Sequence, residues 1–211
     1  MTETHPSPRR AATRDRLIDA AVAAFADKGV LAASVEEICE RAGFTRGAFY
    51  SNFDSKDDLC VAVLTRKGEE VAAAATEAIA LVPVAPVAWE TIDQVIRHAI
   101  DVFQAGHAVD PQWLMARSEL RLYALRNPSI RAALTRAERQ LDDLLAGAIM
   151  DALGRQGATL AIPVDRLLLL LDGYYEALNV EEILDGTGES PARSDDLADL
   201  FRVLIIVPDN R

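Results

Sequence analysis

The chain has 211 residues, half of them hydrophobic, and a formal net charge of −11 at pH 7. This length and composition predict one or two globular domains with a substantial core. The negative charge excludes a protein that coats nucleic acid over its whole surface, because the phosphate backbone is itself strongly negative.

The charge is unevenly distributed along the chain. Residues 1–56 carry eight Lys and Arg and eight Asp and Glu, whereas the remaining residues carry 14 basic and 25 acidic side chains. A neutral, locally basic N-terminal part is expected if that part alone contacts phosphate. The acidic remainder is explained by an ordinary solvated surface.

The first ten residues combine prolines and hydroxyl side chains with two arginines, which predicts a disordered arm over residues 1–10. This arm is either a solvated tail or a source of phosphate or minor-groove contacts from Arg9, Arg10 and Arg14. It lacks an apolar core, so we expect no signal peptide.

A first helix is predicted from about Ala12 to Lys28, with Gly29 as its end. Its apolar residues recur at helical spacing and predict a buried stripe formed by Leu17, Ala21, Ala24 and Phe25. A helix in this position is expected to pack across the segment that follows it and to hold its geometry.

Two short helices joined by a tight turn are predicted between Ser34 and Lys56. Ser34 is a favourable N-cap and Glu37 stands at the capping-box position three residues later. The first of the two helices has one apolar face, at i, i+3, i+4 and i+7, formed by Val35, Ile38, Cys39 and Ala42. Gly43 ends it, because a residue just past a helix often needs a positive φ.

The second of these helices is predicted to begin after a Thr45 cap and to run from Arg46 to Phe53. Its inner face is apolar, whereas the remaining positions are mostly hydrogen-bonding groups with one small residue. A helix that enters the major groove needs such a donor-rich outer face. The pattern indicates a helix-turn-helix, and the alternative is a helical hairpin inside an ordinary bundle.

These residues resemble the TetR family of bacterial transcriptional regulators over about residues 12–64. The matching motifs are Ser34-Val35-x-x-Ile38, Ala42-Gly43-Phe44-Thr45-Arg46-Gly47, Tyr50-x-Asn52-Phe53 and Lys56-x-x-Leu59. The family commonly has His where Asn52 stands and often Ala where Cys39 stands. An amide still donates and accepts hydrogen bonds, so the first departure changes contacts without removing them.

The resemblance implies a homodimeric DNA-binding regulator. No cofactor or metal is expected, because the sequence has no glycine-rich phosphate loop and no metal-ligand spacing. Its DNA partner would be a roughly palindromic operator. The protein would contact base edges through the start of the recognition helix, with Thr45, Arg46 and Gly47. Phosphate contacts are expected from Ser34, Tyr50, Asn52 and Lys56, and such contacts fix register while base contacts fix sequence. The resemblance favours repression over activation, and it implies that a small-molecule effector releases the repressor from its operator.

The rest of the chain is predicted to be helical, which makes the fold class all-α. A long helix starts after Ser55 and continues to about Ala80, where Pro83 and Pro86 force a break. Further helices are expected over 87–106, 111–126, 129–154, 163–185 and 194–206, and no strands are expected. We therefore assign residues 11–56 to DNA binding and residues 57–207 to a ligand-binding and dimerisation bundle.

Two sets of residues in the bundle are assigned to binding. The last two helices carry wide apolar faces, and the resemblance implies a dimer interface that includes Leu167, Leu171, Tyr174, Leu200, Phe201 and Leu204. The same faces fit the core of a monomer. Polar and aromatic residues on apolar helices are candidates for an effector pocket, namely His98, Trp113, Arg117 and Tyr123.

The sequence contains no recognisable catalytic motif, because the histidines, cysteines and paired carboxylates lack the required spacings. Two other functions are still compatible with the sequence: a small helical enzyme, and an interaction protein that keeps the helix-turn-helix as a scaffold. The two cysteines are expected to be free thiols in a reducing compartment. We expect a cytoplasmic protein without a membrane segment, since prolines interrupt the longest apolar run.

Overall fold

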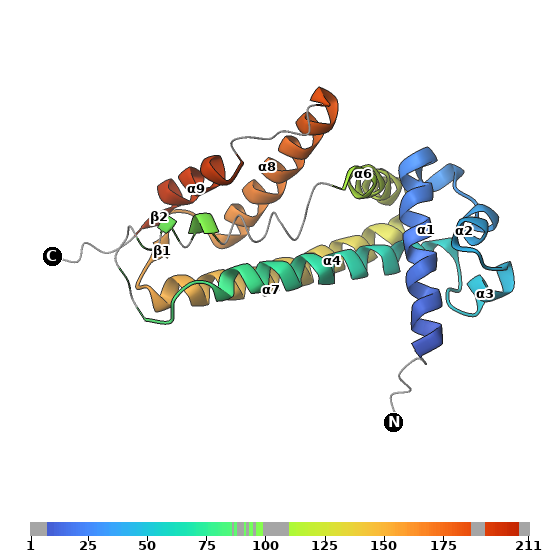
Figure 1. Ribbon diagram of the computed structural model, residues 1–211, viewed down its shortest axis with the longest axis horizontal. Helices are drawn as coiled ribbons and strands as arrows, with labels where there is room; N and C mark the ends of the chain where they lie inside the picture. Colours follow the sequence, from blue (N-terminus) through green and yellow to red (C-terminus); the bar gives the residue numbers. More distant parts are fainter. Residues whose placement is uncertain are drawn as a thin grey trace. The chain divides into compact units, whose positions relative to one another are not determined.

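The computed structural model describes residues 8–85, 87, 91, 93–94, 96–98, 110–186 and 193–206, and it confirms an all-α fold (Figure 1). Its helices are α1 Pro8–Ala32, α2 Val35–Ala42, α3 Arg46–Tyr50, α4 Lys56–Ala80, α6 Pro111–Arg126, α7 Pro128–Arg155, α8 Val164–Asp185 and α9 Arg193–Leu204. The predicted spans of α4, α6, α7 and α8 are confirmed to within two residues. Most of the predicted helix 87–106 lies outside the described residues.

A single pair of two-residue strands interrupts the helical pattern of the described segments. β1 Thr159–Leu160 pairs antiparallel with β2 Ile205–Ile206. The predicted last helix is therefore wrong at its C-terminal end, because residues 205–206 leave α9 and form backbone hydrogen bonds to a distant segment. Two residues are too few to give an alternating pattern that a sequence could reveal.

The chain divides into two compact units. One, the head unit, contains Met1–Lys67 and Asp110–Ala137, and the other, the body unit, contains Gly68–Val109 and Glu138–Arg211. The head unit is larger than the segment 11–56 assigned to DNA binding, because α6 and the first part of α7 belong to it. The assignment of DNA binding to residues 11–56 stays a prediction.

In the head unit α1 lies between α6 and the α2–α3 pair (Figure 1), and its most extensive packing is against α6. The predicted stripe of α1 is confirmed, since all four of its side chains are fully buried: Leu17, Ala21, Ala24 and Phe25. Leu120 of α6 and Leu59 of α4 are fully buried in the same core. α6 thus completes the core on which the helix-turn-helix rests.

Both ends of α1 differ from the prediction. The helix begins at Pro8, so residues 8–10 of the predicted arm are helical, and residues 1–7 lie outside the described residues. Proline is well tolerated in a first helical turn, where its missing N–H is not needed. Gly29 has φ 81° and ψ 159°, and this non-helical residue kinks the chain at the predicted end before one further turn to Ala32.

The body unit is held together by a small apolar cluster and by polar contacts. Leu197 and Ala198 of α9 are buried against partly buried apolar side chains, namely Ile96, Leu171, Tyr174 and Phe201. The buried Gln156 amide donates to the carbonyls of Pro83 and Ala85 and accepts from the Val87 N–H at 3.1 Å. A side-chain amide therefore replaces the backbone partners of this proline-containing segment.

An ion-pair network joins Asp93 and Arg97 to α9 in the body unit. Asp93 is within 3.1 Å of Arg97 and 2.8 Å of Arg202, and Arg97 is 3.2 Å from Asp199. Burial raises the pKa of Asp93, but the hydrogen bonds from Arg97 and Arg202 outweigh burial and hold that pKa below its usual value.

Within one protomer the two sides of α8 differ. Leu167 is fully buried, while Leu171 and Tyr174 pack on the α9 cluster, so three of the predicted dimer residues are used within the protomer. An opposite row of small and apolar residues is open to solvent, and we call it the α8 stripe: Leu170, Gly173, Ala177, Val180 and Leu184. Its spacing of three and four residues marks one face of a helix.

Candidate nucleic-acid interface

The first helix of the helix-turn-helix is capped at both ends by local contacts. The Ser34 hydroxyl accepts from the Glu37 N–H at 3.2 Å, which confirms the predicted N-cap. Gly43 has φ 71°, and the N–H groups of Gly43 and Phe44 donate to the carbonyls of Glu40 and Cys39. This is a Schellman motif, and its left-handed residue explains why glycine stands there.

The second half of the predicted capping box is not formed. The Glu37 carboxylate lies 2.9 Å from Lys28 and 3.1 Å from Arg41. The hydrogen bond from Lys28, the largest influence, lowers the pKa of Glu37. Arg41 also pairs with Asp27 at 2.7 Å, so these charges tie α2 to α1.

The recognition helix α3 is shorter than predicted, since it ends at Tyr50 and not at Phe53. The Thr45 hydroxyl caps it by accepting from the Ala48 N–H at 3.3 Å. Beyond Tyr50 the side chains of Ser51 and Asn52 both donate to the Ala48 carbonyl at 2.8 Å. Such side-chain donors compete with the helical backbone hydrogen bonds and end the helix.

The two faces of α3 have different roles: one is buried and anchors the helix, and the other is exposed. Phe49 and Phe53 are buried, with ring centroids 5.6 Å apart, and they anchor the helix in the head core. The predicted base-reading residues Thr45, Arg46 and Gly47 are all exposed, and Tyr50 is half exposed. The hydroxyls of Thr45 and Ser34 accept backbone protons and keep their own protons to donate outward.

Arg46 has two neighbours on this exposed surface. Its guanidinium lies 2.6 Å from the Glu36 carboxylate of α2 and 5.9 Å from the ring centroid of Tyr50. A hydrogen bond with Tyr50, and then the charge of Glu36, raise the pKa of Arg46. The role of Glu36 could not be predicted from the sequence, because residues 36 and 46 lie on different helices and share no local spacing.

The Asn52 side chain does not point outward, as a side chain that contacts phosphate would. It is half-buried, and its amide nitrogen donates to the Ala48 carbonyl and to the Ser51 hydroxyl. Its side-chain oxygen is buried without a hydrogen-bond partner among the described residues. The predicted phosphate contact of Asn52 stays a prediction, and it would require the side chain to turn outward.

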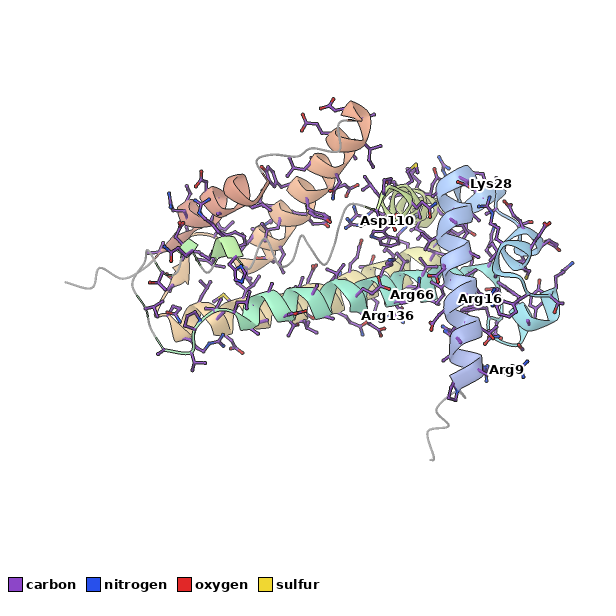
Figure 2. The ribbon with its side chains drawn as sticks, in the orientation of Figure 1. Arg9, Arg16, Lys28, Arg66, Asp110 and Arg136 are labelled. Atoms are coloured by element: carbon purple, nitrogen blue, oxygen red, sulfur yellow. The ribbon has the colours of Figure 1, made fainter. Side chains whose placement is uncertain are left out.

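Three arginines of α1 bind carbonyl groups at the ends of α2 and α3. Arg16, which lies on α1 in Figure 2, donates to the Ala42 carbonyl at 2.9 Å. Arg10 donates to the Ser51 carbonyl at 2.9 Å and Arg14 to the Asn52 carbonyl at 3.1 Å. Cations are favourable at helix C-termini, where carbonyls lack partners. These positive charges therefore fix the angle of the helix-turn-helix.

Lys56 makes the same kind of contact with α1. Its ammonium lies 2.7 Å from the Val30 carbonyl, 3.0 Å from the Ala33 carbonyl and 3.5 Å from the Leu31 carbonyl. An ammonium group has three protons to donate, and three carbonyls surround this one. The phosphate contact predicted for Lys56 is untested, and its observed partners indicate a structural role.

We expect Lys56→Met to lower the free energy of unfolding by about 1–3 kcal/mol, because charged hydrogen bonds at the end of α1 are lost. Urea denaturation measures this change. Lys28→Met is the matched control, since Lys28 makes a surface ion pair worth about 0–1 kcal/mol. Unchanged stability with a weaker salt dependence of DNA binding would assign Lys56 to phosphate instead.

The four predicted effector residues do not all fall in one unit. Trp113, Arg117 and Tyr123 lie on α6 in the head unit, whereas His98 is exposed and belongs to the body unit. The Lys67 ammonium lies 5.6 Å from the ring centroid of Trp113. The effector role of all four residues stays a prediction.

Tyr123 connects α6 to the start of α4. Its hydroxyl donates to Asp57 at 2.8 Å, and the Asn127 amide donates to the other oxygen of the same carboxylate at 3.2 Å. Burial, and then the hydrogen bond to Asp57, raise the pKa of Tyr123. This contact was not predicted, because residues 57 and 123 are far apart in the chain.

Neither a metal cluster nor a membrane helix was found in the part of the chain that the structure describes. No group of three or more His, Cys, Asp or Glu side chains is arranged there to hold a metal ion. None of the helices described is long and apolar enough to cross a membrane.

Comparison with known proteins identifies the family. Residues 17–63 match the bacterial regulatory proteins of the tetR family, and residues 90–205 match the tetracyclin repressor-like C-terminal domain. The chain belongs to the TetR family. Members of this family are helix-turn-helix transcriptional regulators, so the enzyme alternative is rejected.

Individual TetR relatives match either the helix-turn-helix or most of the chain. The regulator SrpR of Pseudomonas putida is 44% identical over 55 residues, 26% of this chain and 26% of that protein. The repressor AcnR of Corynebacterium diphtheriae is 26% identical over 197 residues, 93% of this chain and 90% of that protein. The matches to the first curated relatives span 26% to 47% of those proteins' length.

A solved structure of another regulator shares the fold. The fatty acid degradation regulator FadR from Bacillus halodurans superposes with a TM-score of 0.72 at 16% identity, covering 93% of this chain and 96% of that chain. At this level of identity the similarity concerns the fold alone.

Proposed function

We propose that this TetR-family protein is a repressor that binds a roughly palindromic operator as a homodimer and leaves it when a small-molecule effector binds. The observation that carries the proposal is the exposed edge Thr45-Arg46-Gly47, held on the buried anchor of Phe49. A donor-rich edge on a fixed helix is what major-groove recognition requires.

Gly47 adds support for close contact with DNA. A Cβ atom on residue 47 would lie 3.7 Å from its nearest neighbour, the Thr45 hydroxyl oxygen, which is an ordinary van der Waals distance. The packing of the protein itself does not require glycine at this position. A residue without a side chain lets a backbone approach a partner closely, so we assign Gly47 to the DNA surface.

Phosphate contacts in this proposal come from the edges of the helix-turn-helix. The hydroxyls of Ser34 and Tyr50 are exposed and can donate to phosphate oxygens. Asn52 and Lys56 are retained as weaker candidates, because their donors have partners within the head unit. Such contacts would set the register of the head on the duplex.

The dimer in this proposal uses the α8 stripe. Val180 is 40% exposed and Leu184 is 79% exposed, and the α8 stripe borders a shallow groove along the helix. Exposed apolar rows of this kind on a soluble chain indicate a protein interface. A second copy offers the same stripe, and two identical patches suit a two-fold interface. Of the predicted interface residues, Leu200 and Leu204 are partly buried, and this interface does not depend on them.

Release by an effector is supported by the position of α6. This helix carries three of the predicted effector residues, packs on α1 and holds Asp57 of α4 through Tyr123. A ligand that moves α6 would therefore act on the support of the helix-turn-helix. It can weaken operator binding only if it prefers the unbound arrangement of the heads. The relative AcnR, aligned over 93% of this chain, is named a repressor.

Selection from a genomic duplex library, followed by gel shifts, tests the proposal. The wild-type protein is expected to enrich one roughly palindromic sequence, and a compound that releases it should bind more weakly when operator is present. Linkage requires that both affinities change by the same factor. A protein that enriches no sequence would contradict operator recognition, and equal compound affinity with and without operator would contradict release.

A further inference from the structure

The ion pair between Glu36 and Arg46 is placed where DNA recognition is proposed. Both side chains are exposed, at 57% and 60%, and the oxygen–nitrogen distance is 2.6 Å. Exposed ion pairs contribute little to folding stability, so stability does not explain this one. Its position, joining the first turn of α2 to the first residue of α3, gives it a different use.

The other acidic side chain in the first turn of α2 has a structural role. Glu37 pairs with Arg41 of its own helix and with Lys28 of α1, and the contact with Lys28 ties α2 to α1. Glu36 instead pairs with the candidate base-reading arginine of the next helix. Two adjacent glutamates thus serve two different partners, and Glu36 faces the proposed DNA surface.

The chemistry of the pair restricts what Arg46 can bind. A guanidinium has five N–H donors, and the contact with Glu36 uses the Nη1 end. The remaining donors can reach the O6 and N7 acceptors of guanine as a bidentate pair. A neighbouring carboxylate repels phosphate, because both carry negative charge, whereas a base edge is neutral.

We propose that Glu36 is a positioning residue for sequence recognition, which holds Arg46 toward the guanine of a G·C base pair and disfavours its use on phosphates. This inference rests on the proposed operator-binding function. It makes Glu36 a determinant of specificity that need not contact a base itself.

The test compares Glu36→Ala, Glu36→Gln and a matched control in selections from a randomised duplex library. Glu36→Ala is expected to reduce the preference for guanine about tenfold at the one base pair of each half-site whose preference Arg46→Ala abolishes, and at no other position. Glu36→Gln keeps an acceptor oxygen and should retain part of the preference. Glu40→Ala, an exposed glutamate on the same helix, should leave the preference unchanged.

Two further measurements separate positioning from a general effect of charge. In Glu36→Ala the freed Arg46 can bind phosphate, so the log–log salt slope of non-specific binding should steepen by about 0.9 for each additional phosphate that the protein neutralises. In an Arg46→Ala background, Glu36→Ala should change the base preference at no position of the operator, because Glu36 acts only through Arg46. Thermal unfolding checks that each variant is folded.

Three results would overturn the inference: an unchanged guanine preference in Glu36→Ala, the same change in Glu40→Ala, or a change of base preference at any operator position when Glu36→Ala is added to Arg46→Ala. Each leaves operator binding itself intact. If the wild-type protein selects no sequence, the proposed function and this inference both fail, so the two failures are distinguishable.

Discussion

The double substitution Val180→Glu and Leu184→Glu is expected to convert the protein into a monomer and to lower its operator affinity by about 10²–10⁴-fold. Two linked heads bind the second half-site as an intramolecular event, and avidity of this size is lost when the link is broken. Both positions lie on the α8 stripe, where they point away from the buried cluster around Leu197. Light scattering measures the mass, and gel shifts measure the affinity.

A matched control replaces two exposed leucines of α6, Leu122 and Leu125, by glutamate. They are 46% and 67% exposed, and they lie outside the α8 stripe. The control should keep the oligomeric state of the wild type. A wild-type monomer at micromolar concentration, or a dimer that survives both glutamates in α8, would show that the α8 stripe is not the interface.

Phe49→Ala is expected to lower the stability of the head unit by about 3–5 kcal/mol, which is the usual cost of removing a buried aromatic side chain. The ring is fully buried and lies 5.2 Å from the Tyr50 ring and 5.6 Å from the Phe53 ring. Since this side chain anchors the recognition helix, specific DNA binding should be lost with it. Hydrogen exchange in α1 and α2 reports the head unit separately from the body unit.

Tyr50→Ala is the informative comparison, because Tyr50 is the next residue and is half exposed. It should change the stability of the head unit little and should weaken DNA binding. If Phe49→Ala leaves hydrogen exchange in α1 unchanged, the head core does not depend on this anchor. If Tyr50→Ala leaves DNA affinity unchanged, Tyr50 is not a phosphate contact.

Contacts within a few residues could be predicted from the sequence. The caps at Ser34 and Thr45, the left-handed Gly43 and the buried stripe of α1 all follow from short-range rules on spacing and residue type. The same short-range pattern carries the resemblance to the TetR family. The sequence therefore determined the all-α fold, the helix-turn-helix and the positions most exposed on its recognition helix.

Contacts between distant residues were decided by the tertiary structure. The capping of α2 and α3 by Arg16 and Arg14, and the pairing of Arg46 with Glu36, join different helices. Leu167 was assigned to the dimer interface, although it is buried within the protomer. Hydrophobic spacing shows that a helix has an apolar face, but the same spacing suits a core and an interface. Which partner covers that face depends on how the helices pack in space, and long-range packing leaves no periodic signal in the chain.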